Sequence, residues 1–414
     1  MRVAWLLRDL ALSGGGGIVV QHASRLARDH GIEGTIVRCR PPLGPEWAYP
    51  GLESLPVADL DDVRGERFDL AVATWWETSL DLFDVQAERY AYFLQLLEDS
   101  HYPAGSAEQL GFALTYGLPV RFITAARWIT DVVERMQPGN AAFYVPSGMD
   151  KAVFAVPNTV PLAEGPLRIV VEGGLDLIRK GVPHALEAVR LMSGERHVTL
   201  VTPTAPVAGA RSADGPPPGV DEHVGALSHP ELAALFARSH VLLKLSRAEG
   251  MYGPPLEAFH CGCTCVTNPV TGHEEYVRHA ENALVVDWDD PVGTAHALDL
   301  LARDRELLQR LRGGALETAR AWPSWEASTA QMAEALRTLV AEKPPSPRSS
   351  GARAAAGVES VLAATEIHAR YERRAIDELT HLRDQRVVQT ALRARRKATP
   401  VIARARALRA RLRP

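Results

Sequence analysis

Two glutamates eight positions apart, in the segment 246–257, are the side chains in this sequence best suited to chemistry. The segment reads Ser-Arg-Ala-Glu-Gly-Met-Tyr-Gly-Pro-Pro-Leu-Glu, and its two prolines suit the first turn of a helix. We therefore expect Glu249 on the loop before the helix and Glu257 about one turn inside it. Carboxylates accept hydrogen bonds from sugar hydroxyls, each contributing roughly 1.5–3 kcal/mol, and free N–H groups at a helix start suit an anion. The segment can hold a diol at each carboxylate and a phosphate between them; alternatively, Glu249 caps the helix and Glu257 is solvated.

A basic pair follows an apolar strand pattern in the segment VEGGLDLIRKG, residues 171–181. Arg179 and Lys180 could neutralise a diphosphate leaving group. Preorganised cations stabilise a reaction most where negative charge develops in its transition state. The alternative interpretation is an exposed basic turn.

Four consecutive glycines, Gly14 to Gly17, follow the first apolar segment. Glycine lets the backbone approach a ligand closely, and a helix starting after the run would favour negative charge there. A flexible loop explains the run equally well. Because Ile18 follows directly, the GxGxxG pattern is missing and the segment does not indicate NAD binding.

Aromatic and acidic residues in the N-terminal half form a second candidate binding segment. Trp75, Trp76 and Glu77 follow a buried strand pattern and would lie at its carboxyl end. Aromatic faces beside carboxylates suit stacking on a sugar ring and hydrogen bonding to it, although core packing explains the tryptophans equally well. The segment YFLQLLEDSHYP, residues 92–103, adds further polar side chains: Gln95, Glu98, Asp99 and His101.

Strand and helix patterns alternate along most of the chain, which predicts parallel sheets covered by helices. In the N-terminal half we expect strands at 2–7, 34–39, 68–76 and 120–126 and helices at 18–31 and 127–136, with Gly31 as a C-terminal cap. In the C-terminal half we expect strands at 167–174, 197–202, 241–246 and 263–268 and helices at 181–192, 229–239 and 254–262.

Two α/β domains facing a central cleft follow from this alternation, with ligands at the carboxyl ends of the strands. A proline-rich stretch at 150–166 is expected to be the hinge, and 203–220, rich in Pro, Gly and Ala, a mobile loop. The predicted divisions are a first domain at 1–158, a second domain at 159–323, a helix at 324–342 returning to the first domain, a linker at 343–357 and a helical basic tail at 358–414.

The composition is that of a globular protein with 414 residues, 46% of them apolar. This length predicts two domains, and a net charge of −4 argues against general nucleic-acid binding. No apolar run approaches the ~20 residues of a membrane span, and Arg8 and Asp9 interrupt the first apolar run too early for a signal peptide. We therefore expect a cytoplasmic protein whose four cysteines are buried rather than metal-binding.

The run 223–286 resembles the donor-binding domain of family 4 glycosyltransferases, and the likeness extends over roughly residues 1–340. Glu249 and Glu257 have the family's spacing, and the pattern continues at Gly262, Gly272 and Glu275. The resemblance implies the GT-B fold, with an acceptor-side domain at 1–158 and a nucleotide-sugar-binding domain at 159–323. It implies that Glu249 contacts the transferred sugar and Glu257 the ribose. It also implies that further residues bind the donor: Gly15, Gly16, Gly250, Met251, Tyr252, Gly253, Gly272 and Glu275.

One departure from the family concerns the basic pair. Relatives have an Arg directly after the strand and a Lys before the helix; Lys180 matches the Lys, but Gly174 stands at the Arg position. Arg179 would then have to substitute from a neighbouring position. The segment 92–103 resembles bacterial rhamnosyltransferases of the polysaccharide-assembly kind.

The resemblance implies a retaining transfer from a nucleotide-sugar to a glycan or lipid-linked glycan. Lys180, Arg179 and loop amides would stabilise the departing diphosphate without a protein nucleophile. The nucleotide-sugar is a co-substrate, and we expect no cofactor and no metal. The alternative function is a non-catalytic GT-B-like subunit of a glycan-assembly complex, which Gly174 favours. An oxidoreductase is disfavoured by the missing dinucleotide pattern, while an epimerase or phosphorylase on the same scaffold stays open.

Basic residues are concentrated at the C-terminal end. Residues 391–414 hold nine Arg or Lys and no acid, so the other 390 residues carry a net charge of −13 against −4 for the whole chain. Near an anionic membrane each basic residue contributes about 1 kcal/mol of attraction. The tail therefore suits peripheral membrane contact; the alternative is a solvated helix or a protein-contact arm.

Overall fold

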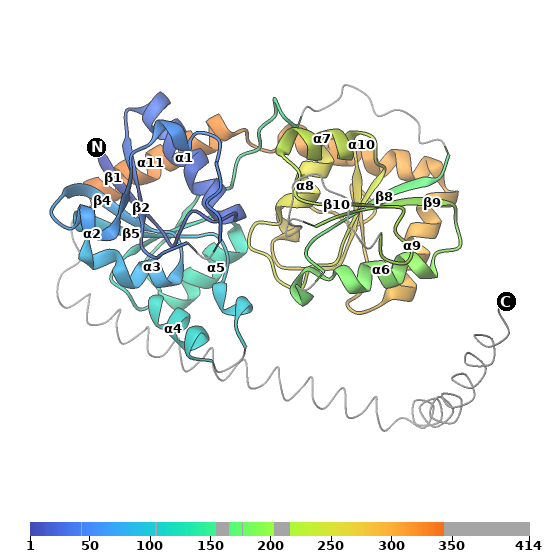
Figure 1. The fold of residues 1–414 in the computed structure, drawn as a ribbon, viewed down its shortest axis with the longest axis horizontal. Helices are drawn as coiled ribbons and strands as arrows, with labels where there is room; N and C mark the ends of the chain where they lie inside the picture. Colours follow the sequence, from blue (N-terminus) through green and yellow to red (C-terminus); the bar gives the residue numbers. More distant parts are fainter. Residues whose placement is uncertain (43, 104–105, 155–164, 176, 203–215, 343–414) are drawn as a thin grey trace, which may run out of the picture.

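The computed structural model describes residues 1–342 except 43, 104–105, 155–164, 176 and 203–215. Two α/β domains lie next to each other, each built around a parallel sheet (Figure 1). The expected α/β architecture is confirmed. The predicted domain boundary at 158–159, the linker and the basic tail lie outside the described residues, as do most of the predicted hinge and most of the Pro- and Gly-rich loop.

Seven parallel strands form the sheet of the first domain, in the order β3-β2-β1-β4-β5-β6-β7. Val3 and Trp5 pack into one buried cluster and Ala4 and Leu6 into another, so both faces of the sheet are covered. Strands buried on both faces are largely apolar, as in the buried part of β1, Val-Ala-Trp-Leu-Leu. The elements are β1 Arg2–Leu7, α1 Gly14–His30, β2 Glu33–Arg38, β3 Val57–Asp59, α2 Leu60–Val63, β4 Arg67–Ala73, α3 Trp76–Asp81, β5 Gln86–Leu94, η3 Glu98–His101, α4 Ala107–Thr115, β6 Arg121–Thr124, α5 Arg127–Met136 and β7 Phe143–Tyr144.

Helix α1 begins at Gly14, four residues before the start that we predicted at residue 18. The Ser13 hydroxyl accepts a hydrogen bond from the Gly16 N–H at 3.0 Å, and serine is among the best residues at this capping position. The glycine run therefore forms the first helical turn rather than a loop. Gly31 ends the helix in the left-handed conformation with φ of 63°, as predicted.

Six parallel strands form the second sheet, in the order β10-β9-β8-β11-β12-β13. Its two buried faces pack against helices in the same way as in the first domain. The elements are β8 Leu167–Glu172, η4 Ile178–Lys180, α6 Val182–Leu191, β9 Arg196–Val201, β10 Glu222–Val224, α7 His229–Ala237, β11 Val241–Lys244, α8 Gly253–His260, β12 Thr264–Thr267, η5 His273–Glu275, β13 Ala283–Val285, α9 Pro291–Arg303 and α10 Arg305–Ala321.

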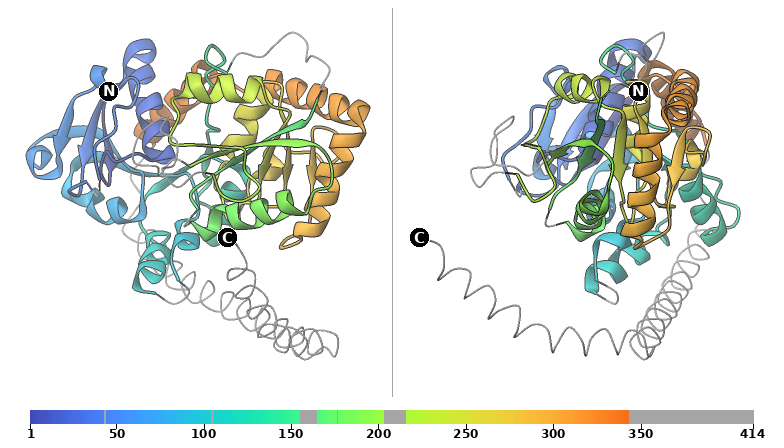
Figure 2. Two further views of the ribbon diagram at one scale, coloured as in Figure 1. Left: turned by 45° about the vertical axis from the view of Figure 1, so that its right-hand side comes forward. Right: turned by 90° about the vertical axis from the view of Figure 1, so that its right-hand side faces the viewer.

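Loops that follow strands of the two sheets meet between the domains, and Figure 2 shows the two domains from two further sides. Gln95 directly follows β5 of the first domain, and Gly250 lies on the loop after β11 of the second. A Cβ atom on Gly250 would lie 1.8 Å from the Gln95 carbonyl oxygen, so only glycine fits there. Ligands of parallel sheets bind at this edge, so the functional site is expected here.

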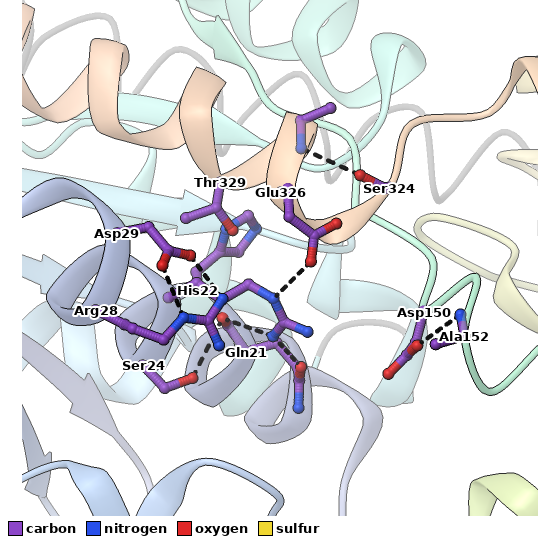
Figure 3. A network of polar contacts seen from close by, with 12 residues as sticks. Gln21, His22, Ser24, Arg28, Asp29, Asp150, Ala152, Ser324, Glu326 and Thr329 are labelled. Carbon is purple, nitrogen blue, oxygen red and sulfur yellow. Dashed lines mark hydrogen bonds and ion pairs between the residues drawn. The ribbon is translucent and has the colours of Figure 1, made fainter.

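The last described helix, α11 (Trp325–Ala341), crosses back and packs on the first domain beside α1 (Figure 1). Figure 3 shows polar contacts at this junction, among them His22 of α1 and Thr329 of α11, whose side chains lie 3.5 Å apart. The His22 ring packs edge-on against Phe93 and Trp325. Burial, and secondarily Arg25, lower the pKa of His22 to about 3, so a neutral ring joins α11 to the first core.

Candidate active site between the domains

Glu249 lies on the loop between β11 and α8, as predicted, and its carboxylate forms an ion pair with Lys180. The distance from Lys180 Nζ to Glu249 Oε1 is 2.8 Å, and the two side chains are 22% and 12% exposed. Burial alone would raise the pKa of Glu249, but the positive charges of Lys180 and Lys244 outweigh burial and hold it below its usual value. The structure thus brings together two of the predicted catalytic side chains, both charged.

Glu257 lies one turn inside α8 and is partly buried, as the proline positions predicted. Its carboxylate makes no hydrogen bond or ion pair with any residue that the structure describes. Burial, and then the negative charge of Glu172, raise the pKa of Glu257 to about 7, while Lys244 lowers it. A half-buried carboxyl without a protein partner is a suitable acceptor for ligand hydroxyls.

The raised pKa of Glu257 predicts a pH-dependent stability. The folded state favours the protonated carboxyl, so ionisation destabilises the fold increasingly from pH 4.5 to 7 and fully above pH 7. We expect Glu257→Gln to melt at a higher temperature than the wild type at pH 8, with a smaller difference at pH 5. Thermal unfolding at both pH values measures this. Equal differences at the two pH values would contradict the assignment.

A buried ion pair between Lys244 and Glu172 lies beneath these carboxylates and was missed from the sequence. The Lys244 side chain is fully buried, and its ammonium group contacts the Glu172 carboxylate and also the Glu172 carbonyl oxygen at 3.3 Å. The two residues end neighbouring strands, because Leu243 of β11 pairs in register with Val171 of β8. Burial would lower the pKa of Lys244, but the surrounding carboxylates raise it. The signal in the sequence was a single lysine ending an otherwise apolar strand.

The second predicted cation, Arg179, precedes Lys180 in η4, and no described residue forms an ion pair or side-chain hydrogen bond with it. Burial, followed by the charges of Arg179 and Lys180, lowers the pKa of His101 to about 4. These cations therefore lie close to His101 of the first domain. At Gly174 a Cβ atom would come within 3.1 Å of the Leu177 side chain, so an arginine there would have to displace it.

The glycine run approaches the site from the first domain. The Gly15 carbonyl accepts a hydrogen bond from Gln95 Nε2 at 3.3 Å, so the first turn of α1 lies beside the carboxyl end of β5. At Gly16 a Cβ atom would lie 2.9 Å from the Tyr49 hydroxyl. The glycine at this position is therefore required by packing against Tyr49, independently of any ligand.

The loop from Gly250 to Gly253 contributes backbone rather than side chains to the site. The Gly250 carbonyl accepts a hydrogen bond from Trp128 Nε1 of α5 at 2.9 Å. Met251 packs against the cores of both domains. The prediction that Tyr252 binds a ligand through its side chain is wrong. This side chain is fully buried in the second domain, and its hydroxyl donates a hydrogen bond to the Lys244 carbonyl at 2.9 Å. Its ring therefore supports the site from beneath.

The carboxylate of Glu275, predicted to bind the donor, instead contacts the first domain. One oxygen accepts a hydrogen bond from the Arg127 backbone N–H, and the other accepts one from the Tyr144 hydroxyl at 2.9 Å. Both carboxylate oxygens are thus engaged without a ligand. Gly272, three residues earlier, has a φ of 84° and packs against the Gly250 carbonyl, where a Cβ atom would lie 2.1 Å away. Glycine is therefore required at position 272 by the backbone conformation and by packing against Gly250.

The predicted acceptor side divides into interior and accessible residues. Glu98 is 1% exposed, and its carboxylate accepts hydrogen bonds from the Trp76 backbone N–H and the Tyr92 hydroxyl. Burial foremost raises the pKa of Glu98 well above its usual value. The Trp76 indole packs in the core and donates to the Tyr102 hydroxyl at 2.9 Å. The prediction that Trp76 and Glu98 contact an acceptor is therefore wrong, because both side chains are buried in the first domain.

The remaining acceptor-side residues lie nearer the interdomain site. Trp75 packs edge-on against His101, with ring centroids 5.7 Å apart. Both residues are only partly buried, as are Gln95 and Asp99. The buried Nε1 of Trp75, Nδ1 of His101 and Oε1 of Gln95 have no hydrogen-bond partner among the described residues. Buried polar atoms are normally satisfied, so these three atoms are available to a polar ligand.

The segment Asp-Trp-Asp at 287–289 contains an aspartate, Asp289, that contacts basic residues of the second domain. Asp289 forms an ion pair with Arg247 and lies 3.4 Å from His184 Nε2, while Asp290 caps α9.

In the part of the chain that the structure describes, none of the helices is both long and apolar enough to cross a membrane.

A match to a known family covers most of the second domain. Residues 166–304 match the family described as Glycosyl transferases group 1. This range contains Lys180, Glu249, Glu257 and the buried Lys244–Glu172 pair. The family match and the geometry thus point to the same part of the chain.

Two curated proteins are similar to parts of the chain. The O-antigen biosynthesis protein RfbC of Myxococcus xanthus is 27% identical over 273 residues, which is 65% of this chain and 20% of that protein. D-inositol 3-phosphate glycosyltransferase 1 of Catenulispora acidiphila is 34% identical over 91 residues, 22% of each chain. The chain thus spans about a fifth of the length of the curated relatives it matches.

Solved structures share the fold at low sequence identity. Sucrose-phosphate synthase from Thermosynechococcus elongatus superposes with a TM-score of 0.66 at 18% identity, covering 82% of this chain and 99% of that one. Anabaena HepE, solved with UDP and glucose, gives 0.63 at 14% identity, covering 82% and 100%. The predicted resemblance to glycosyltransferases is therefore confirmed: the chain has the two-domain GT-B fold of these solved structures, and its residues 166–304 match the Glycosyl transferases group 1 family.

Proposed function

We propose that this chain is a retaining glycosyltransferase that moves a hexosyl group from a nucleotide-sugar to a glycan or lipid-linked glycan. The observation that carries the proposal is the Glu249–Lys180 ion pair at the edge where the two sheets meet, together with Glu257, whose carboxylate has no partner among the described residues. HepE has been solved with UDP-glucose, and RfbC is named for O-antigen biosynthesis. These neighbours support a nucleotide-sugar donor and a role in making a surface polysaccharide or glycoconjugate.

Each charged side chain binds a different part of the donor. Glu257 accepts hydrogen bonds from the ribose hydroxyls, Glu249 contacts the transferred sugar, and Lys180 neutralises the diphosphate. An ammonium group has three donors, so Lys180 can keep its bond to Glu249 while donating to a phosphate oxygen. Arg179, which has no protein partner among the described residues, supplies the second positive charge in place of the arginine missing at Gly174.

The transfer requires no protein nucleophile. The bond between the anomeric carbon and the diphosphate oxygen breaks, and the acceptor hydroxyl attacks from the same face to form the new glycosidic bond. The acceptor proton passes to the departing diphosphate, whose growing charge Lys180 and Arg179 stabilise. The nucleotide-sugar is a co-substrate, and the scheme uses no cofactor and no metal.

A thermal-shift screen of nucleotide-sugars tests the proposal. Uridine, thymidine and guanosine donors are each added to the full chain, because a tight ligand raises the melting temperature by mass action. We expect one class of base to stabilise the protein and its sugar to be transferred or hydrolysed. A rhamnosyl donor is the specific candidate, owing to the resemblance of residues 92–103. No stabilisation by any donor, together with no turnover, would overturn the assignment.

A non-catalytic subunit of a glycan-assembly complex is the second candidate, and Gly174 is the observation that favours it. With glycine there, the site lacks one cation that relatives place directly after the strand. Such a subunit would bind a nucleotide-sugar without consuming it. Release of free nucleotide from a bound donor separates the two functions.

We further propose that the basic tail at 391–414 brings the enzyme to the inner face of the plasma membrane, where a lipid-linked acceptor would lie. Chains ending at residues 390 and 414 are compared for co-sedimentation with anionic and neutral liposomes. The longer chain should bind anionic liposomes more strongly, and moderate salt should weaken that binding. Equal binding of the two chains would reject this role.

A further inference from the structure

Helix α5 of the first domain begins without a cap of its own. Its capping residue, Ala126, has no side chain that could accept a hydrogen bond, and its first turn contains no acidic residue. The first N–H groups of a helix need acceptors, and a negative charge there is stabilised by the helix dipole. The acceptor at this helix comes from the other domain: the Glu275 carboxylate contacts the Arg127 N–H.

A second hydrogen bond fixes the same carboxylate. The Tyr144 hydroxyl donates to Glu275 Oε2 at 2.9 Å, and the Arg127 guanidinium lies 4.3 Å from the centre of the Tyr144 ring. Burial, and then the charge of Glu275, raise the pKa of Tyr144 above its usual value, so its hydroxyl remains a donor. Glu275 is therefore held by two groups of the first domain at once.

The neighbouring residue of α5 holds the donor loop. Trp128 Nε1 donates to the Gly250 carbonyl at 2.9 Å, directly beside Glu249 in the chain. Gly250 in turn is enclosed between the Gln95 backbone of the first domain and Gly272, which precedes Glu275 by three residues. The start of α5 thus contacts both the loop that carries Glu249 and the segment that carries Glu275.

We propose that Glu275 is an interdomain positioning residue, which caps α5 across the domain boundary and holds the domains in the closed arrangement that places the Glu249 loop. Separation of the domains would break both hydrogen bonds of Glu275 and leave the start of α5 uncapped. Because the proposed donor site lies between the domains, donor binding and this contact stabilise the same closed state and are coupled. The coupling to the donor rests on the proposed function; the capping contact does not.

Three single variants test the contact. Glu275→Gln removes the charge, and Tyr144→Phe removes only the hydroxyl hydrogen bond. Glu274→Gln is the matched control, because this neighbouring side chain is 51% exposed and pairs only with His273 among the described residues. Each full-length variant is compared with the wild type by hydrogen–deuterium exchange of peptides covering 125–132 and 247–253, and by UDP titration calorimetry.

We expect faster exchange in both peptides for Glu275→Gln and Tyr144→Phe, and wild-type exchange for Glu274→Gln. Where UDP binds the wild type, the first two variants should bind it about tenfold more weakly. If UDP binds neither the wild type nor any variant, the donor does not carry uridine. The exchange result still tests whether Glu275 caps α5. Wild-type exchange in Tyr144→Phe, or weaker UDP binding in Glu275→Gln alone, would overturn the proposal and make Glu275 a donor ligand or a free surface group.

Discussion

Replacement of Lys180 by alanine is expected to lower kcat for sugar transfer by about 10²–10³, the usual loss when one preorganised group that stabilises transition-state charge is removed. The Lys180 ammonium lies 2.8 Å from Glu249 and is partly shielded from water, so its charge is little screened. Glu249→Ala should cause a comparable loss, since it removes the proposed sugar contact and the partner that orients Lys180. Steady-state transfer from the donor identified in the thermal-shift screen measures both effects.

The matched control for this experiment is Arg190→Ala. Arg190 also lies on the α6 side of the second domain, but it is exposed and pairs only with Glu187 among the described residues. Its removal should leave kcat within about twofold, as for most exposed surface pairs. Wild-type turnover in either Lys180→Ala or Glu249→Ala would remove these residues from the mechanism and favour the non-catalytic alternative.

Lys244→Met is expected to lower the free energy of unfolding by about 3–5 kcal/mol, the cost of leaving one member of a buried ion pair without its partner. The Lys244 side chain is fully buried and Glu172 is 19% exposed, so water cannot readily replace the lost charge. Tyr252, whose hydroxyl donates to the Lys244 carbonyl, would keep its backbone partner. Denaturant unfolding monitored by tryptophan fluorescence measures the loss.

A double variant separates the charge from the packing. Lys244→Met combined with Glu172→Leu removes both charges, and apolar replacement of a whole buried pair is often neutral or stabilising. The double variant should therefore regain most of the stability lost by Lys244→Met, giving a strongly non-additive mutant cycle. A double variant as unstable as the single one would show that the lysine stem, rather than the charge, is what the core requires.

Local patterns predicted the elements that carry the proposed donor site. The proline pair predicted the start of α8, and the eight-residue spacing placed Glu249 before it and Glu257 inside it. The apolar strand patterns predicted β8 and β11, whose ends carry the charged residues. These features depend on the chain within one or two turns, so the sequence contains the information directly.

Burial across elements could not be predicted in the same way. Trp76 and Glu98 are residue types that often bind sugars, but α3 and η3 pack so that both side chains point into the first domain. Glu275 fits the family's donor pattern, yet α5 of the other domain engages its carboxylate. The helix α1 was predicted to begin after the glycine run, but it begins at Gly14 because the Ser13 side chain caps it there. Each difference arises from a partner distant in sequence or from a single side-chain contact.

The position of α11 has a consequence for how the polypeptide is made. The core of the first domain contains Met332, Leu336 and Leu339, which are synthesised after the entire second domain. The nascent N-terminal half therefore leaves the ribosome with an uncovered apolar face beside α1. We infer that the first domain is completed only after the second domain has been synthesised, and that a gene fragment encoding only the first 323 residues would yield an aggregation-prone product instead of two separable halves.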